Sequence, residues 1–287
     1  MKLTELFKPG KPTLSFEVFP PKTTDKIESV KKATEEIAAL HPVFMSVTYG
    51  AGGGTSAYTV AVAKNIQETQ KVPTLAHLTC VSSTREQIDH QLSLLVENGI
   101  ENIMALRGDV PEGASAPEEW SFQHASELIT YIKTKGDFCI GGACYPEGHP
   151  ESANQREDIQ NLKKKVEAGC DFLTTQMFFD NNILYNFLYK IREAGIRVPV
   201  VAGIMPVTNG RQIARICRIS GNALPPRFKQ IIDRFADYPA AMKQAGVAFA
   251  TEQIIDLLAN GVEHIHVYSM NKPDVAAKIM DNLSKIL

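Results

Sequence analysis

Short apolar runs alternate with longer amphipathic segments along the whole chain. Each run is rich in β-branched, aromatic or aliphatic residues and lies beside Gly, Pro or Asn, which is typical of β-strands. We expect eight strands, at residues 14–19, 43–49, 73–80, 102–108, 138–145, 172–179, 198–205 and 264–270.

The segments between these runs show the periodicity of helices. Residues 155–168 place their apolar side chains on one stripe. Ser83, followed three positions later by Glu86, is a capping-box signature for a helix over 84–98. Because strands that alternate with helices return to the same edge of a sheet, the pattern predicts parallel pairing.

Eight strand–helix units predict an α/β fold, a single (β/α)8 TIM barrel, rather than an open doubly wound sheet. No GxGxxG motif follows the first strand, which argues against a Rossmann domain. The long interval before the last strand predicts extra helices between strands seven and eight, within residues 223–260. With no Pro-, Gly- or Ser-rich linker in the chain, we expect one catalytic domain over residues 1–287.

Composition narrows the class of protein. The 287 residues are 44% hydrophobic and 22% charged, as in packed soluble proteins, and 30 basic against 32 acidic side chains give a net charge of −2. That balance predicts no binding to nucleic acid or to an anionic membrane. The start MKLTELFKPG lacks the apolar core of a signal peptide, so we expect a cytoplasmic protein. Five scattered cysteines without a CxxC pair indicate buried thiols.

In such barrels, ligands bind at the carboxyl ends of the strands. Leu14, Phe16 and Val18 share the face of the first strand that should pack against helices, which turns Glu17 inward. A carboxyl group enclosed by the barrel loses hydration, so its pKa rises and it becomes suited to general acid catalysis. The alternative is an inward Glu paired with a nearby Lys or Arg for structure alone.

Other strand ends also carry polar groups. LRGDV (106–110) allows a ligand to approach the backbone at Gly108, beside Arg107 and Asp109, although a simple surface turn is the alternative. GAGGG (50–54) could cradle a phosphate through its amides, but without a following Lys-Ser/Thr a flexible loop is favoured.

Two histidines on the last expected strand and one lysine run each allow two interpretations. His264 and His266 share a face and could ligate a metal, or could be interior or cofactor-facing histidines. The lysine run in 161–169 is typical of a solvated helix face. Lys165 nevertheless lies seven residues after Asp158, on the same stripe of the expected helix, which allows a ligand contact.

Taken together, the segments resemble those of a known family. The chain contains, in order, FEVFPPK (16–22), SVTYGAGG (46–53), HLTC (77–80), LRGD (106–109), YPEGHPE (145–151), TQMFFD (175–180), GIMPVTN (203–209) and HVYSMNK (266–272). This series is similar to that of the bacterial methylenetetrahydrofolate reductases, from the first strand to the last.

The resemblance implies an FAD-containing barrel with two substrates. A reduced nicotinamide, NADH or NADPH, would pass hydride to FAD and leave. Methylenetetrahydrofolate would then receive the hydride at the same flavin face, giving methyltetrahydrofolate for methionine biosynthesis with ping-pong kinetics. The resemblance further implies a homo-oligomer without the regulatory domain of the eukaryotic enzymes.

The resemblance also assigns roles to residues. Glu17 matches the general acid that protonates the folate and opens its five-membered ring to an iminium. Asp109 matches a residue that stabilises this cation, and Gln176 one that contacts both nicotinamide and folate. The positions that match flavin contacts are Thr48, His77, Arg107, Gly108, Asp109, Ala143, Tyr145, His149, Asp158 and Lys165.

Two substrate-binding positions depart from the family pattern. Ile216 stands where some relatives place an aromatic residue that stacks on the substrate, and Lys272 stands at an Arg position near the substrate end. The resemblance implies no metal. The competing interpretations are a metal-dependent barrel hydrolase that uses His264 and His266, and a non-catalytic pterin-binding barrel.

Overall fold

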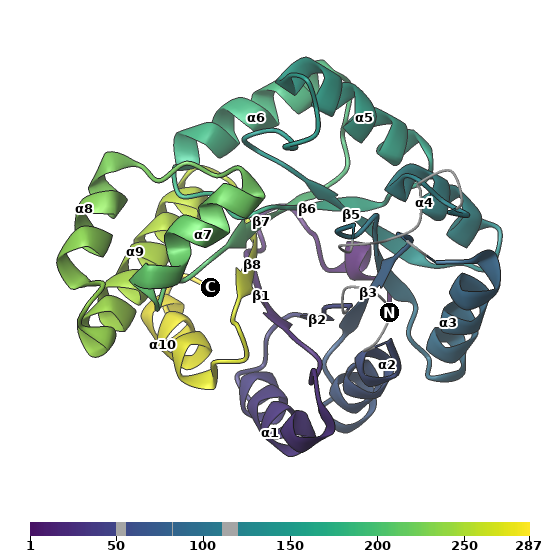
Figure 1. The fold of residues 1–287 in the computed structure, drawn as a ribbon, viewed down its shortest axis with the longest axis horizontal. Helices are drawn as coiled ribbons and strands as arrows, with labels where there is room; N and C mark the ends of the chain where they lie inside the picture. Colours follow the sequence, from purple (N-terminus) through teal and green to yellow (C-terminus); the bar gives the residue numbers. More distant parts are fainter. Residues whose placement is uncertain (50–55, 82, 111–119) are drawn as a thin grey trace.

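Eight parallel strands close into a barrel in chain order, which confirms the expected fold class (Figure 1). The structure, a computed structural model, describes residues 1–49, 56–81, 83–110 and 120–287. Closure is made by β8, which pairs with β1 from Thr13–His264 to Glu17–Tyr268. The strands are β1 (Thr13–Val18), β2 (Met45–Val47), β3 (Thr74–Thr79), β4 (Asn102–Leu106), β5 (Cys139–Cys144), β6 (Phe172–Thr175), β7 (Val200–Ile204) and β8 (His264–Tyr268).

The helices form a ring outside the barrel (Figure 1). They are α1 (Ile27–Ala38), α2 (Ser56–Lys64), α3 (Arg85–Glu97), α4 (Ala125–Lys133), α5 (Gln155–Glu167), α6 (Asn181–Glu193), α7 (Gly210–Ser220), α8 (Pro226–Phe235), α9 (Pro239–Ala259) and α10 (Pro273–Leu283). The extra helices expected within 223–260 are α8 and α9. No helix in the described part of the chain is both long and apolar enough to cross a membrane.

The capping box expected at the start of α3 was wrong by one residue. Thr84, not Ser83, is the N-cap, and its hydroxyl accepts from the backbone N of Gln87 at 3.3 Å. In return, the Gln87 side chain accepts from the backbone N of Thr84 at 2.8 Å. The reciprocal pair satisfies two amides at the helix end that have no partner within the helix.

Side chains on the outside of the barrel form the main hydrophobic core with the surrounding helices. Leu14, Phe16 and Val18 of β1 are at most 2% exposed and belong to this core, as their alternation predicts. Burying one such side chain contributes on the order of 2 kcal/mol. The alternation then directs Ser15 and Glu17 into the barrel, where both are buried.

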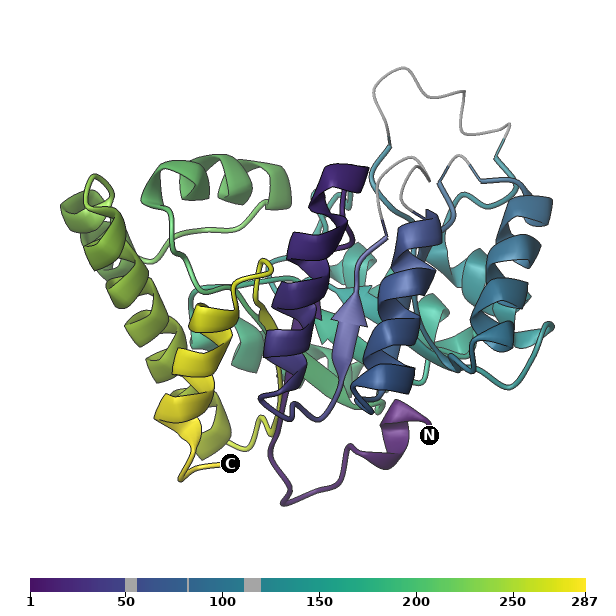
Figure 2. The same cartoon turned by 90° about the horizontal axis from the view of Figure 1, so that it is seen from below.

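The amino-terminal segment covers the bottom of the barrel, at the end opposite the carboxyl ends of the strands (Figure 2). Leu3 and Phe7 pack there with a second cluster of buried side chains that includes Phe44 and Phe172. A Cβ on Gly141 would lie 2.5 Å from the Phe172 ring, so glycine leaves this aromatic ring the room it needs inside the barrel.

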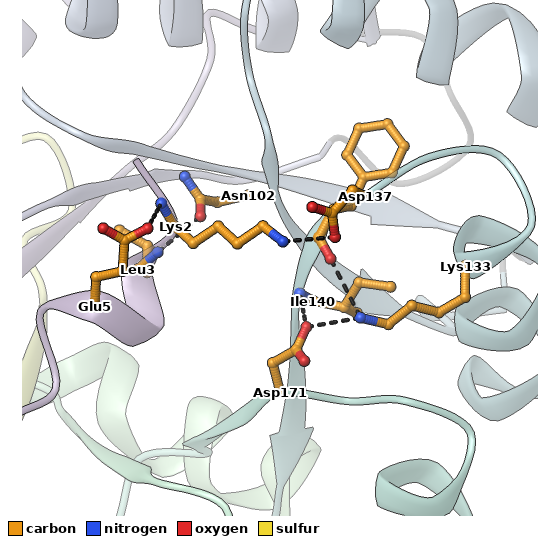
Figure 3. Close-up of polar contacts among 9 residues, drawn as sticks. Lys2, Leu3, Glu5, Asn102, Lys133, Asp137, Ile140 and Asp171 are labelled. Atoms are coloured by element: carbon orange, nitrogen blue, oxygen red, sulfur yellow. Dashed lines mark hydrogen bonds and ion pairs between the residues drawn. The ribbon is translucent and has the colours of Figure 1, made fainter.

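Polar contacts connect the amino-terminal segment to residues at the starts of the strands (Figure 3). The backbone N of Leu3 donates to the side chain of Asn102 at 2.9 Å, and Lys2 pairs with Asp137 at 2.5 Å. Nearby, Lys133 donates to Asp171 at 2.9 Å. These contacts and the aromatic cluster fill one end of the barrel, while the cavities described next lie at the other.

Candidate active site

Two adjoining cavities lie where the strands end. The inner cavity, of about 410 Å³, lies over the barrel interior and is lined by residues of β1, β3, β6 and β8. The outer cavity, of about 620 Å³, extends from the ends of β4 and β5 to α5. Leu106, Ala143 and Tyr145 line both cavities. Their volumes are in the range of sites that bind cofactors and small substrates.

Glu17 lines the inner cavity from β1 and is 7% exposed. Burial raises the pKa of its carboxyl group to about 8, because a carboxylate there loses its hydration, while the Ser46 hydroxyl at 3.4 Å acts in the opposite direction. The carboxyl group is therefore largely protonated at neutral pH. The expected inward orientation is correct, and in the described part of the chain no Lys or Arg forms an ion pair with it.

His77, on β3, lies next to Glu17 in the wall of the inner cavity. Its Nε2 lies 3.5 Å from Oε2 of Glu17 and has no hydrogen-bond partner among the described residues. Burial lowers the pKa of His77 to about 4, so the imidazole is neutral at neutral pH. Both partners are then uncharged, and the contact is not an ion pair.

A chain of hydrogen bonds connects β8 to the same carboxyl group. The Ser15 hydroxyl donates to the carbonyl of Ile265 at 2.9 Å and therefore accepts from Nδ1 of His266 at 2.7 Å. Nε2 of His266 is then unprotonated and accepts from the Ser46 hydroxyl at 2.9 Å. Ser46 has a single proton, so its shorter bond to His266, at 2.9 Å, weakens the 3.4 Å donation to Glu17 that would lower the pKa of the carboxyl group.

Tyr268 completes this wall of the inner cavity. Its hydroxyl donates to the carbonyl of Thr175 at 2.5 Å. A Cβ at Gly203 would lie 2.3 Å from that hydroxyl and 2.4 Å from that carbonyl oxygen, so only glycine leaves the bond intact. Gln176 and Ile216, the two residues expected to contact substrate, also line this cavity.

The end of β4 contributes Arg107, Gly108 and Asp109 to the outer cavity. Gly108 has φ +88°, and a Cβ there would lie 3.0 Å from Thr79, so the turn requires glycine. The guanidinium of Arg107 donates to both carboxylate oxygens of Glu151, at 2.5 and 2.6 Å. This bond raises the pKa of Arg107 and lowers that of Glu151.

Helix α5 supplies a half-buried cation, Lys165, to the outer cavity. Lys165 donates from Nζ to the carbonyl of Ala143 at 2.6 Å, and burial lowers its pKa. The charge of Asp158 opposes this shift, but no carboxylate of the described residues forms an ion pair with Lys165. Asp158, on the same stripe of α5, also lines the cavity, and burial raises its pKa. An amine that burial deprives of water and that lacks a bound anion is suited to hold the diphosphate of a nucleotide cofactor.

The structure places almost every expected site residue on one of the two cavities. The outer cavity is lined by Arg107, Gly108, Asp109, Ala143, Tyr145, His149, Asp158 and Lys165, and the inner one by Glu17, Thr48, His77, Ala143, Tyr145, Gln176 and Ile216. Lys272 lines neither; it precedes α10 and donates to the hydroxyl of Thr208 at 2.5 Å. The glycine run at 50–54 lies outside the described residues.

The two histidines that could form a metal site on β8 lie in different environments. His264 bonds Thr13 at 3.1 Å near the Phe7 ring, whereas His266 uses both ring nitrogens on serines. Over residues 1–49, 56–81, 83–110 and 120–287, no three His, Cys, Asp or Glu side chains are grouped to hold a metal ion.

Sequence reasoning missed two groups that contact the expected site residues. Ser46 bonds both His266 and Glu17, and alternation along β2 would have turned it inward with Glu17. Glu151 pairs with Arg107, 44 residues away in the chain, and no sequence pattern signals that contact.

The fold and the site together define a class of protein, the barrel enzymes. A closed (β/α)8 barrel with a neutral, enclosed acid at the carboxyl end of β1 has the architecture of a barrel enzyme's active site. The family model for methylenetetrahydrofolate reductase matches residues 2–284. The chain belongs to this family.

Sequence relatives agree with the family match. The chain is 36% identical over 298 residues to methylenetetrahydrofolate reductase (NADH) 1 of Arabidopsis thaliana, covering 99% of this chain and 50% of that protein. It is 34% identical over 274 residues to 5,10-methylenetetrahydrofolate reductase of Escherichia coli, covering 96% of this chain and 91% of that protein. The chain thus spans about half the length of its plant relatives and most of the length of the bacterial one.

Solved structures agree on the fold. A protein from Clostridium thermocellum that binds two copies of 5-methyl-5,6,7,8-tetrahydrofolic acid superposes with a TM-score of 0.68 at 14% identity, covering 100% of both chains. Dihydropteroate synthase from Xanthomonas albilineans superposes with a TM-score of 0.55 at 13% identity, covering 96% of this chain and 93% of that one. At these identities the similarity concerns the barrel alone.

Proposed function

We propose that this protein reduces methylenetetrahydrofolate to methyltetrahydrofolate with NADH or NADPH, in a ping-pong sequence that uses FAD. Family membership supports the reaction. The observation that carries the proposal is the buried Glu17, whose pKa of about 8 keeps a proton available inside a cavity of substrate size.

The residues of the outer cavity fit FAD. Lys165 is a half-buried cation that forms no ion pair with a carboxylate of the described residues, which suits a diphosphate. Gly108 permits close approach to the backbone, and Tyr145 and His149, with ring centroids 4.6 Å apart, provide aromatic surface. When bound, FAD would accept hydride from the nicotinamide and supply it to the one-carbon group of the folate.

The chain's own residues would prepare the folate for that hydride. Glu17 would donate its proton to the ring nitrogen that becomes the leaving group, so that the five-membered ring opens to a cationic iminium. Asp109 would stabilise this cation from the adjoining cavity. Gln176 would orient both substrates through its amide, and Ile216 would contact them through apolar surface.

The test uses the purified protein and its visible absorbance. We expect a yellow protein whose flavin bleaches with NADH under anaerobic conditions and recovers its colour on addition of methylenetetrahydrofolate. A protein that binds folate but shows neither step would instead be the non-catalytic pterin-binding barrel. A colourless protein with stoichiometric metal and hydrolytic activity would be the metal-dependent alternative. Either result would overturn the proposal.

Oligomeric state and cellular location are two further predictions. A homo-oligomer, implied by the family resemblance, is checked by light scattering coupled to gel filtration. A cytoplasmic location is checked by cell fractionation.

A further inference from the structure

Three segments of the chain meet at Asn222, just after α7. This side chain is 8% exposed, and its Nδ2 donates to the carbonyl of Met177 at 2.8 Å and to Oε1 of Glu147 at 3.0 Å. The other carboxylate oxygen of Glu147 accepts from the backbone N of Ala223 at 2.9 Å. One carboxylate and one amide thus join the β5–α5 loop, the β6–α6 loop and the end of α7.

Each joined segment also borders the inner cavity. Met177 lines it directly, and Tyr145, two residues before Glu147, lines both cavities. Ile216 lines it from α7, six residues before Asn222. The two hydrogen-bonding side chains therefore lie behind the wall that faces the substrate, without lining the cavity themselves.

The two ends of α7 are held differently. At its start, a Cβ on Gly210 would lie 2.8 Å from Cβ of Ala236, so this end packs closely against the end of α8. At the other end, Gly221 has φ +73° and lies beside Pro150, whose Cγ would be 3.3 Å from a Cβ there. Besides the bond from Asn222 to Met177, the contacts of Glu147 with Asn222 and Ala223 connect this end to the β5–α5 loop, and Ile216 lies in the same half of the helix.

We propose that Glu147 and Asn222 are positioning residues, which hold the carboxyl end of α7 against the β5–α5 loop and thereby fix Ile216 as a wall of the substrate site. The proposal rests on the proposed function only for the identity of the substrate. Both bonds to Glu147 are made to a carboxylate, which strengthens them relative to bonds between neutral groups. Their loss frees the helix end that carries Ile216 without removing any group that touches the cofactor.

The experiment compares the holoenzyme with Glu147→Ala and Glu147→Gln. The alanine variant loses both acceptors, whereas the glutamine side chain keeps one acceptor oxygen and needs no change in volume. Asp237→Ala is the matched control, because Asp237 also pairs with α7, through Arg211 at 2.8 Å, but that pair is 76% exposed on both sides.

Hydrogen exchange of the α7 amides, followed by mass spectrometry, measures the positioning directly. We expect exchange over residues 211–221 to rise about tenfold in Glu147→Ala and by less in Glu147→Gln, while α5 exchanges as in the unaltered protein. Asp237→Ala should leave α7 exchange unchanged. Unchanged α7 exchange in both Glu147 variants overturns the proposal, whatever their activity.

Kinetics then tests the effect on the substrate. We expect the KM for methylenetetrahydrofolate to rise about fivefold in Glu147→Ala, with kcat within twofold and flavin content unchanged. A variant with faster α7 exchange but an unaltered KM overturns the positioning role. If the unaltered protein itself fails to oxidise its reduced flavin with this folate, the proposed function fails, and the exchange measurement still decides whether Glu147 holds α7. Should Glu147→Ala not fold, Glu147→Gln and Asn222→Ala provide the same comparison.

Discussion

Oε2 of Glu17 lies 3.5 Å from Nε2 of His77, and both side chains are 10% exposed. The distance is that of an ion pair, yet burial acts oppositely on the two groups. It raises the pKa of Glu17 to about 8 and lowers that of His77 to about 4. Between these values both groups are neutral, so the site holds a proton on the carboxyl group without an adjacent cation that would remove it.

Replacement of this acid should separate the two half-reactions. We expect Glu17→Gln to retain flavin and its reduction by NADH, because neither needs a proton from this position. Oxidation of the reduced flavin by methylenetetrahydrofolate should slow by at least 100-fold. Anaerobic stopped-flow absorbance measures both rates. Near-normal folate reduction in this variant would remove Glu17 as the acid.

The same residue should make stability depend on pH. A folded-state pKa raised from 4.5 to about 8 means that the native protein holds a proton that the unfolded chain releases over this interval. The contribution of Glu17 to stability is therefore complete below pH 4.5 and is lost as pH rises through about 8. At about 1.4 kcal/mol per unit, the full loss is on the order of several kcal/mol.

Glu17→Gln cannot ionise and escapes this loss. Relative to the unaltered protein, its melting temperature should increase progressively between pH 5 and pH 9. The histidines act in the opposite direction, because the lowered pKa values of His77 and His266 weaken the fold as pH falls below 6.5. They are present in both proteins, so the difference isolates Glu17. A difference in melting temperature that does not change with pH would contradict the raised pKa.

The hydrogen-bond chain through His266 should help to set the pKa of Glu17. In Ser15→Ala, Nδ1 of His266 loses its acceptor. The tautomer protonated at Nε2 then becomes favourable, which frees the Ser46 hydroxyl to donate to Glu17. A donor stabilises the carboxylate, so the pH at which folate reduction declines should fall by about one unit.

Thr13→Val is the control for this shift. Thr13 lies on the same strand and bonds His264 at 3.1 Å, at the end of the barrel away from the cavities. Its removal should leave the pH profile of folate reduction unchanged. Equal profiles for all three proteins would show that Ser15 does not influence the acid.

Asp109 should act selectively on the folate step. It lines the outer cavity directly after Gly108, where its charge would stabilise the cationic iminium. We expect Asp109→Asn to slow folate reduction at least tenfold more than flavin reduction by NADH. Stopped-flow measurement of each half-reaction gives the comparison, and equal slowing of both would argue against this role.

The aromatic cluster at the bottom of the barrel should matter for stability alone. Phe7 is 8% exposed, and its ring centroid lies 5.3 Å from that of Phe172 and 4.8 Å from that of His264. Phe7→Ala should lower the free energy of unfolding by about 3 kcal/mol, because it leaves a cavity in a packed cluster. Denaturant titration measures this, and kcat should be unchanged. Altered kcat would show that the two ends of the barrel are coupled.

The hydrophobic periodicity of the sequence was sufficient to predict the architecture. Eight apolar runs separated by helical segments predicted the closed barrel and the extra helices before β8, because side-chain burial on a strand or a helix repeats at fixed intervals. The strand ends were less well predicted: β2 has three residues, whereas seven were expected. Hydrophobic runs continue into turns, and only pairing with the neighbouring strands decides where the ladder stops.

Part of the site could also be predicted from this periodicity. Alternation along β1 was enough to predict that Glu17 faces inward with a raised pKa. Because ligands bind at the carboxyl ends of barrel strands, the sequence also predicted that Arg107, Asp109 and Gln176 lie at one end of the barrel. Lys272 shows the limit of motif matching, because it bonds Thr208 and lines neither cavity.

The sequence by itself determined which residues face inward and which end of the barrel carries chemistry, because both follow from local periodicity and chain direction. Only the tertiary structure decided that His77 is neutral beside Glu17, that Ser46 donates a hydrogen bond to His266, and that Glu147 contacts the end of α7 through Asn222. Those relationships join side chains 60 to 220 positions apart. Their distances and desolvation depend on how the strands and loops pack, which no local pattern encodes.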